Sequence, residues 1–264
     1  MSTAYAMRDS MTMLRRNLKH AQRYPSMTVS IVATPILMLL LFVYVFGGTL
    51  GAGIPHSGSG GDRAQYTNFV VPGIILMAVT AGAISTAVSV CTDMTEGIIN
   101  RFRTMAISRS SVLTGHVVGN VIQTMISLVL VIGVALLVGF RPHGSALDWV
   151  AALAMLSLLA FALSWVSAAI GLGAGSIEAA SNAPMPLTFL PFLGSAVVPP
   201  SSMPVGLRQF AEYQPFTSIT NTLRGLLMGT HIGNNAVIAL AWGVGLSIFG
   251  YLWARSVFNR DARR

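Results

Sequence analysis

Few residues in this 264-residue chain could do chemistry, and their spacing argues against most kinds of active site. A metal site needs ligands at short, regular spacing, whereas the five histidines are scattered: His20, His56, His116, His143 and His231. Ser195 with His116 or His231 could suggest an intramembrane hydrolase, but no nucleophile elbow surrounds this serine. The single cysteine, Cys91, cannot form an intrachain disulfide. We therefore expect no catalytic residue and no metal site.

The elements that must position these residues are long apolar segments. Hydrophobic residues make up 53% of the chain and the mean hydropathy is +0.69, which is high for a soluble domain. A helix needs about 20 apolar residues to cross a bilayer. Six runs near that length contain no Asp, Glu, Lys or Arg: 27–46, 69–90, 112–139, 149–171, 179–198 and 236–254. The sequence predicts an all-α integral membrane protein with six transmembrane helices in a single domain, residues 1–264.

The distribution of basic residues predicts the orientation of these spans. With six crossings, twelve of the sixteen basic residues lie on the side of the two termini, and four lie on the other side. Basic residues favour the cytoplasmic side of a membrane, so both termini are expected in the cytoplasm. The net charge of +8 is explained by this orientation and implies no nucleic-acid partner.

Two segments outside the six runs have helical patterns of their own. In residues 1–25, Met7, Met11, Leu14 and Leu18 share one helical face, which predicts a basic amphipathic helix in the cytoplasmic interface. The alternative is that its charges only set the topology. Residues 203–230 show two half-length helical patterns that meet at Pro215. They predict a pair of short helices dipping into the outer leaflet, or else a helix lying on the surface.

The fifth run and the segment before it differ from a continuous transmembrane helix. Three prolines lie within the run and two more at its outer end, so a kinked or broken helix is expected: Pro184, Pro186, Pro191, Pro199 and Pro200. The segment GAGSIEAASN before it, residues 173–182, is expected to be a short cytoplasmic loop.

Charge is concentrated in one segment, EGIINRFRTMAISRSS, residues 96–111. In helical register Ile98, Phe102 and Met105 form an apolar stripe, while Glu96 lies in the first turn. This pattern predicts a short amphipathic helix over residues 95–109 on the cytoplasmic membrane face. A mere connection could be much shorter, so the segment is expected to present a surface to a cytoplasmic partner. The alternative is an interfacial helix whose charges only set topology.

The sequence also indicates where the energy for transport would come from. A P-loop needs a lysine to reach the nucleotide phosphates, and the only lysine, Lys19, lies in the sequence RRNLKH. Ion-driven transport usually needs carboxylates or histidines within the membrane, and the six runs contain no carboxylate. If the protein transports, its energy is expected to come from another subunit, and the chain itself is expected to bind no cofactor.

Residues 96–120, EGIINRFRTMAISRSSVLTGHVVGN, resemble the coupling-helix region of ABC-2 type permeases of the daunorubicin-resistance exporter group. The matching residues are Glu96, Gly97, Arg101, Phe102, Arg103, Ile107, Ser108, Arg109 and Gly115. Ala106 stands where the family usually has proline. Residues 213–229, YQPFTSITNTLRGLLMG, are similar to the family's outer segment before its last span. There the matches are Gln214, Pro215, Arg224, Gly225 and Gly229.

The resemblance implies a half-transporter in the bacterial plasma (inner) membrane. It would pair with a second permease chain, as a homodimer or heterodimer, and with two ABC ATPase subunits that carry ATP and Mg. Members of the family export drugs, lipids or polyketide-like molecules. The residues expected to couple to the ATPase are Glu96, Gly97, Arg101, Phe102, Arg103, Met105 and Arg109. The residues expected at an outer gate are Gln214, Pro215, Asn221 and Arg224.

Polar residues within the runs are candidates for a translocation path. His116, Asn120 and Gln123 share one face of the third run, and Asn182 lies in the fifth. The first three would either line a path or make interhelical hydrogen bonds. Since no charge lies within the runs, the cargo is expected to be apolar or amphipathic. The alternative functions are an ion-coupled secondary transporter of drugs or lipids and a membrane scaffold without transport.

Overall fold

The computed structural model describes residues 25–51, 62–96 and 109–261, and every regular element in these ranges is a helix. In chain order the elements are α2 (Pro25–Leu40), the π-helical turn η1 (Leu41–Val45), α3 (Gly47–Gly51), α4 (Asp62–Thr95), α6 (Arg109–Val138), α7 (Ala146–Gly173), α8 (Ile177–Asn182), α9 (Met185–Phe189), the 3₁₀ turn η2 (Pro200–Ser202), α10 (Val205–Tyr213), α11 (Pro215–Met228) and α12 (Asn235–Asp261). The all-α class expected from the sequence is confirmed for these residues.

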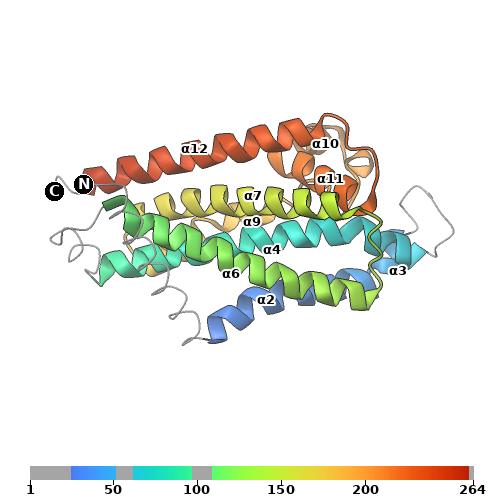
Figure 1. The fold of residues 1–264 in the computed structure, drawn as a ribbon, viewed down its shortest axis with the longest axis horizontal. Coiled ribbons are helices and arrows are strands. Elements are labelled where there is room, and N and C mark those ends of the chain that lie inside the picture. Colours follow the sequence, from blue (N-terminus) through green and yellow to red (C-terminus); the bar gives the residue numbers. More distant parts are fainter. Residues whose placement is uncertain (1–24, 52–61, 97–108, 262–264) are drawn as a thin grey trace.

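The long helices run along the longest axis of the molecule, with α10 and α11 gathered at one end (Figure 1). Helices α4 and α7 form the centre of the bundle. In the most apolar 18-residue stretch of each helix, 72% of α4 and 67% of α7 is buried. The corresponding shares are 28% for α6 and 17% for α12, which lie at the periphery. Helix α2 packs on α4 and α6, while α12 packs mainly on α7. A central pair with peripheral helices leaves wide apolar surfaces for lipid or for another chain.

Four helices in the described part of the chain are long and apolar enough to cross a membrane: α4, α6, α7 and α12. They contain the second, third, fourth and sixth apolar runs of the sequence. The chain is therefore a multi-pass membrane protein. The first run is instead divided between α2 and η1 and ends just before α3, and its apolar helical part, Val32–Val45, is shorter.

The fifth run is broken, as its prolines predict. It forms the short helices α8 and α9, with Pro184 at the N-cap of α9, and then a series of turns up to η2. Proline lacks an N–H donor and clashes with the preceding turn, so a continuous helix is disfavoured here. The loop expected over residues 173–182 is wrong in extent, because α8 begins at Ile177. The Ser176 hydroxyl accepts a hydrogen bond from the Ala179 amide at 3.1 Å and starts this helix early.

The two half-length helices expected around Pro215 are present as α10 and α11. Most of α11 is buried in the bundle, and its buried apolar residues include Ile219, Leu223, Leu226 and Leu227. Helix α11 ends at Gly229, whose φ of 67° is in the left-handed region that favours glycine. The amides of the turn between α6 and α7 then donate to the carbonyl oxygen of Leu227 at 3.0 Å. This turn satisfies a backbone acceptor that the end of α11 would otherwise leave free.

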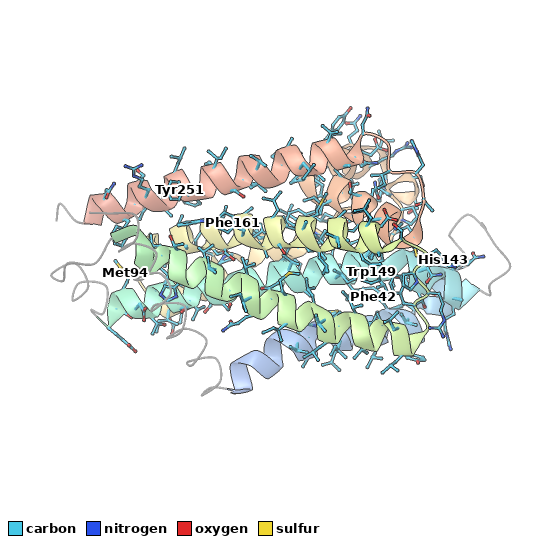
Figure 2. All side chains as sticks on the ribbon, in the orientation of Figure 1. Phe42, Met94, His143, Trp149, Phe161 and Tyr251 are labelled. Atoms are coloured by element: carbon cyan, nitrogen blue, oxygen red, sulfur yellow. The ribbon has the colours of Figure 1, made fainter. Side chains whose placement is uncertain are left out.

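Aromatic side chains fill the contact between α7 and α12. The ring of Trp165 meets Tyr251 of α12 edge-on, with centroids 5.1 Å apart, and meets Phe161 at 6.2 Å in a similar geometry. Figure 2 shows Phe161 and Tyr251 on these neighbouring helices. Edge-to-face pairs each add about 0.5–1.5 kcal/mol beyond the burial of their surface. The Trp165–Tyr251 pair joins the peripheral α12 to the central α7, and Phe161 supports Trp165 from within α7.

The contact between the central helices α4 and α7 depends on the absence of a side chain at Gly171. A Cβ atom built there would lie 2.4 Å from the carbonyl oxygen of Ala87. We predict that Gly171→Ala separates α4 and α7 and lowers the free energy of unfolding by about 1–3 kcal/mol, the usual cost of overpacking.

Thermal unfolding of the purified protein in detergent, followed by tryptophan fluorescence, measures this effect. Gly173→Ala is the matched control, since a Cβ there meets no atom within 4 Å. An equal shift in both variants would contradict the close approach at Gly171.

Candidate functional site

Two groups of hydrogen-bonded polar side chains lie within the apolar bundle, toward opposite ends of α4. The first, which we call the polar ladder, joins α4, α6 and α7 and consists of Ser85, Ser89, Asp93, His116, Asn120 and Ser164. The second, which we call the Arg224 clamp, joins α4, the broken fifth run and α11. It consists of Arg224, Asn221, Ser195 and the backbone carbonyl group of Phe69.

The contacts of the polar ladder repeat at helical spacing. His116 Nε2 lies 2.9 Å from Asp93 Oδ2, and its Nδ1 lies 3.2 Å from Ser89 Oγ. One turn further along both helices, Ser85 Oγ lies 2.9 Å from Asn120 Oδ1. Helices α4 and α6 are antiparallel, and steps of four residues keep each polar side chain on the same face of its helix. Successive pairs therefore meet along one seam.

Asn120 also fastens this seam to α7. Its Nδ2 donates to Ser164 Oγ at 2.7 Å, and the Ser164 hydroxyl donates to the carbonyl oxygen of Ala160 at 2.6 Å. Both ends of the Asn120 amide are thus used, one toward α4 and one toward α7. Asn120 and Ser164 are buried, and a buried amide without partners would be costly. The hydrogen bonds therefore fix the relative positions of three helices.

The Asp93–His116 pair is the most polar contact of the ladder, and both residues are only 6% exposed. With Asp93 ionised, Nε2 of His116 carries the proton and donates to the carboxylate. In the neutral tautomer Nδ1 then accepts a hydrogen bond from Ser89. Because both side chains are almost fully buried, each lowers the cost of burying the other, and removing one would leave the second without this contact.

The expectation that the spans contain no carboxylate is wrong. Helix α4 continues to Thr95, so Asp93, three residues past the end of the apolar run 69–90, is part of a membrane-spanning helix and is buried. The helical period Ser85, Ser89, Asp93 carries the signal that would have predicted this residue, because all three lie on one face. Counting only uninterrupted apolar residues ended the span too soon.

The Arg224 clamp holds three segments together at the other end. Nη2 of Arg224 donates to the carbonyl oxygen of Ser195 at 2.7 Å and to that of Phe69 at 3.2 Å, and Nε also donates to Phe69 at 3.3 Å. Nη1 donates to Asn221 Oδ1 at 2.8 Å, and this oxygen accepts a second bond from the Ser195 hydroxyl at 2.9 Å. The guanidinium carbon lies 3.9 Å from the centre of the Phe69 ring. Only the planar fork of arginine can make all of these contacts at once.

Beside the clamp, the junction of α10 and α11 buries polar groups without partners. Gln214 and Thr217 are 5% and 4% exposed. Both amide atoms of Gln214 and the Thr217 hydroxyl lack a hydrogen-bond partner among the described residues. A Cβ atom on Gly194 would lie 2.6 Å from Gln214 Nε2, so the amide packs directly on the broken segment. Unsatisfied buried groups make this junction a weakly held part of the structure.

The structure places the residues predicted for the outer gate together. Arg224 and Asn221 form the clamp, while Gln214 and Pro215 make the adjacent junction of α10 and α11. Of the residues predicted for ATPase coupling, Glu96 is exposed directly after α4, and Arg109 is the first residue of α6. The others lie outside the described residues: Gly97, Arg101, Phe102, Arg103 and Met105. The amphipathic helix expected in residues 1–25 falls almost wholly outside them too.

The four candidates for a translocation path differ in their surroundings. His116 and Asn120 are buried in the polar ladder, where they make the interhelical hydrogen bonds considered as their alternative role. Gln123 is half-buried on α6, and Asn182 is exposed at the end of α8. Of the pairs considered for a hydrolase, Ser195 and His116 lie in different groups, because Ser195 donates to Asn221 in the clamp whereas His116 contacts Asp93 in the ladder.

The sequence matches the family described as ABC-2 type transporter over residues 9–228. Among similar proteins is the daunorubicin resistance ABC transporter permease protein DrrB1 of Streptomyces coeruleorubidus. It is 29% identical over 261 residues, which cover 98% of this chain and 89% of the relative. The probable doxorubicin resistance ABC transporter permease protein DrrC of Mycobacterium tuberculosis is 21% identical over 220 residues, or 83% of this chain and 77% of the relative. The match spans both motifs, residues 96–120 and almost all of 213–229.

The chain belongs to the ABC-2 type transporter family.

This permease is therefore the membrane subunit of an ABC transporter, a class in which separate ATPase subunits hydrolyse ATP. The resemblance inferred from the two motifs is confirmed, and association with ABC ATPase subunits follows from it. The positions of the polar ladder and the Arg224 clamp can be compared with the segment between α4 and α6. The ladder lies where α4 and α6 lead into the segment between them, and the clamp lies at the opposite end of α4.

We predict that Arg224→Lys loosens the end of the permease that contains the clamp. Lysine retains the charge but cannot donate to Phe69, Ser195 and Asn221 together, so backbone acceptors lose partners. The expected loss in the free energy of unfolding is about 1–3 kcal/mol.

The thermal unfolding temperature in detergent measures this loss. Arg208→Lys is the control, because Arg208 makes only an exposed ion pair with Glu212 at 2.7 Å on the adjacent α10. Such exposed pairs contribute about 0–1 kcal/mol. Equal unfolding temperatures for Arg224→Lys and the unmodified protein would show that the clamp contributes no stability.

Proposed function

We propose that this permease exports hydrophobic or amphipathic molecules across the bacterial plasma membrane, using ATP hydrolysed by partner subunits. The observation that carries the proposal is the family match over residues 9–228 together with relatives named for daunorubicin and doxorubicin resistance. The apolar character of the spanning helices supports this class of cargo, since a neutral apolar molecule meets few unfavourable groups along them. Drugs, lipids and polyketide-like molecules share this chemistry.

The contact with the ATPase is made by residues 95–109. Helix α4 ends at Thr95 and α6 begins at Arg109, so this segment joins the central helix α4 to the peripheral α6. Its residues Glu96, Arg101, Phe102, Arg103 and Met105 offer charges, hydrogen bonds and apolar surface to a protein groove. A force applied to this segment acts on both helices at once. The segment is therefore well placed to convert closure of the ATPases into movement of the spans.

The working transporter contains two permease chains and two ATPase subunits. The chain offers a wide apolar surface for a second permease, identical or different, because α6 and α12 are mostly exposed. Lipid covers the rest of that surface. ATP and Mg bind to the ATPase subunits and no cofactor binds to this chain, whose only lysine, Lys19, is not in a P-loop.

A second candidate function is ion-coupled secondary transport, and the observation that favours it is the Asp93–His116 pair. Buried carboxylates and histidines in membrane helices serve as proton relays in pumps and transporters, and this pair is buried in α4 and α6. The two functions differ in their source of energy. Doxorubicin efflux that is blocked by vanadate supports ATP-driven export, whereas efflux that is blocked only by dissipating the proton gradient supports the second candidate.

The proposed coupling role gives a direct test in cells that carry the permease with its ATPase subunits. We predict that Glu96→Ala and Arg103→Lys weaken co-purification of the ATPase and reduce doxorubicin efflux, because lysine cannot reproduce arginine's planar fork at a docking surface. Membrane insertion is unchanged, since the spans are unaltered and Arg101 and Arg109 keep the segment basic.

The control is Arg260→Lys, a charge-conserving change near the end of α12 and outside the proposed docking segment. If the charges of residues 95–109 only set topology, then Glu96→Ala and Arg103→Lys behave as the unmodified protein does. Normal co-purification and normal efflux in both variants would therefore refute the coupling role.

The proposed orientation places both termini and residues 95–109 in the cytoplasm, with six crossings. We predict that a membrane-impermeant thiol reagent added outside the cell labels Gly58→Cys but not Asn100→Cys, each made in a Cys91→Ser background. The reason is the excess of basic residues on the side of the termini. Labelling in opened membrane vesicles confirms that both cysteines are reactive. External labelling at position 100 without labelling at 58 would reverse the orientation.

A further inference from the structure

We infer that the polar ladder makes α4 and α6 move as one rigid unit when the ATPase acts on the segment between them. Its side chains are thus positioning residues of the transport cycle. The inference rests on the proposed function, because it concerns how a push on residues 95–109 reaches the spans. It identifies a mechanical role for Asp93, Ser89, His116 and Asn120 rather than a role in contacting cargo.

The position of the ladder is the first argument. Asp93 lies two residues before the end of α4, and His116 lies seven residues after the start of α6. The seam then continues away from this end through Ser85 and Asn120 to Gly82 and Thr124. From residue 93 to residue 82 it extends about 16 Å along α4. A push arriving at this end of the two helices meets the ladder first.

The pattern of hydrogen bonds is the second argument. If α4 slid past α6 by one turn, Asp93 would leave His116, and Asn120 would leave Ser85. Separating Asp93 from His116 would leave two buried groups without this contact, at a cost of about 1–3 kcal/mol for a neutral group and more for a charged one. Apolar contacts alone would not distinguish the two positions so strongly. The ladder therefore opposes sliding more than it opposes a joint movement.

The end of the seam farther from residues 95–109 can hold a disulfide crosslink, which the test uses. A Cβ atom on Gly82 would lie 3.6 Å from Thr124 Cβ, within the 3.5–4.5 Å range of disulfides. The Thr124 hydroxyl has no hydrogen-bond partner among the described residues, so its replacement removes no such bond. Gly82→Cys with Thr124→Cys, in a Cys91→Ser background, can thus link α4 to α6 without changing the ladder.

The experiment uses the permease reconstituted with its ATPase subunits in liposomes, with doxorubicin as the transported probe. The ladder is broken by Asp93→Asn together with His116→Leu, so that no unpaired carboxylate is left buried. Two quantities are measured: ATP hydrolysed and doxorubicin moved. The control is Thr80→Ala, since this buried hydroxyl of α4 bonds only within its own helix, to the carbonyl oxygen of Met77 at 2.8 Å.

Breaking the ladder is expected to leave ATPase co-purification intact and to lower the doxorubicin moved per ATP by about tenfold, the factor that corresponds to about 1.4 kcal/mol. Oxidising the two cysteines in the broken ladder restores the ratio, and reduction abolishes it again. With the ladder intact, the oxidised and reduced forms transport equally. Thr80→Ala keeps the normal ratio. Titration of free thiols verifies the crosslink, and Gly82→Ser with Thr124→Ser shows the effect of the substitutions without one.

Two outcomes would overturn the inference. In the first, the crosslink stops transport although the ladder is intact, which means that α4 and α6 must slide. In the second, the variant with the broken ladder moves as much doxorubicin per ATP as the unmodified protein. Failure of the proposed function looks different, because the unmodified permease would then not co-purify with the ATPase or would not transport doxorubicin in an ATP-dependent manner.

Discussion

Inside a bilayer no water is available to hydrogen-bond a polar side chain, so the protein must supply every partner itself. The polar ladder and the Arg224 clamp meet this constraint by joining several polar groups in one set. Asp93 lies against His116, Asn120 lies between Ser85 and Ser164, and Arg224 is surrounded by acceptors. Each set joins helices that are distant in the sequence. The helix positions in this permease are thus specified where polar residues meet, while apolar packing fills the space between.

The strength of single interhelical hydrogen bonds in membranes averages only about 0.6 kcal/mol. The polar ladder is therefore not a large source of stability, and its importance lies in register. Apolar side chains on neighbouring helices tolerate small shifts, whereas the Asp93–His116 contact is lost once the two side chains move apart. The contact of Gly171 with the backbone of Ala87 restrains α4 and α7 in a second way, through steric fit. Together these contacts make α4, α6 and α7 one unit to which the other helices are attached.

Much of the fold follows from the sequence because hydropathy and proline act locally. Apolar runs predict the spans that form α4, α6, α7 and α12. Prolines predict the break at Pro184 and the two helices that meet at Pro215. The candidate site was predictable only in part. Arg224 and Asn221 were identified from a motif, but their partner, the carbonyl of Phe69, is a backbone group 155 residues away along the chain, and no local pattern can indicate it. Asp93 was missed for a different reason. A span was taken to end at the first charged residue, but α4 continues past this point because His116 on α6 pairs with Asp93.

The two polar groups lie toward opposite ends of α4, and this arrangement relates the ATPase side of the molecule to the opposite end. The ladder fastens α4 to α6 beside the segment proposed to contact the ATPase, and the clamp fastens α4 to α11 through the carbonyl of Phe69. Between Asp93 and Phe69 the chain is one continuous helix, with Pro72 its only proline. A helix transmits displacement along its axis because its backbone hydrogen bonds are stiff, so movement at the ladder reaches the clamp directly. There the buried side chains of Gln214 and Thr217 have no hydrogen-bond partner in the part of the chain that the structure describes, which lowers the cost of opening the junction of α10 and α11. The ladder thus holds the register of α4 and α6 at one end of α4, while the junction of α10 and α11 near the other end has few side-chain hydrogen bonds to lose when it opens.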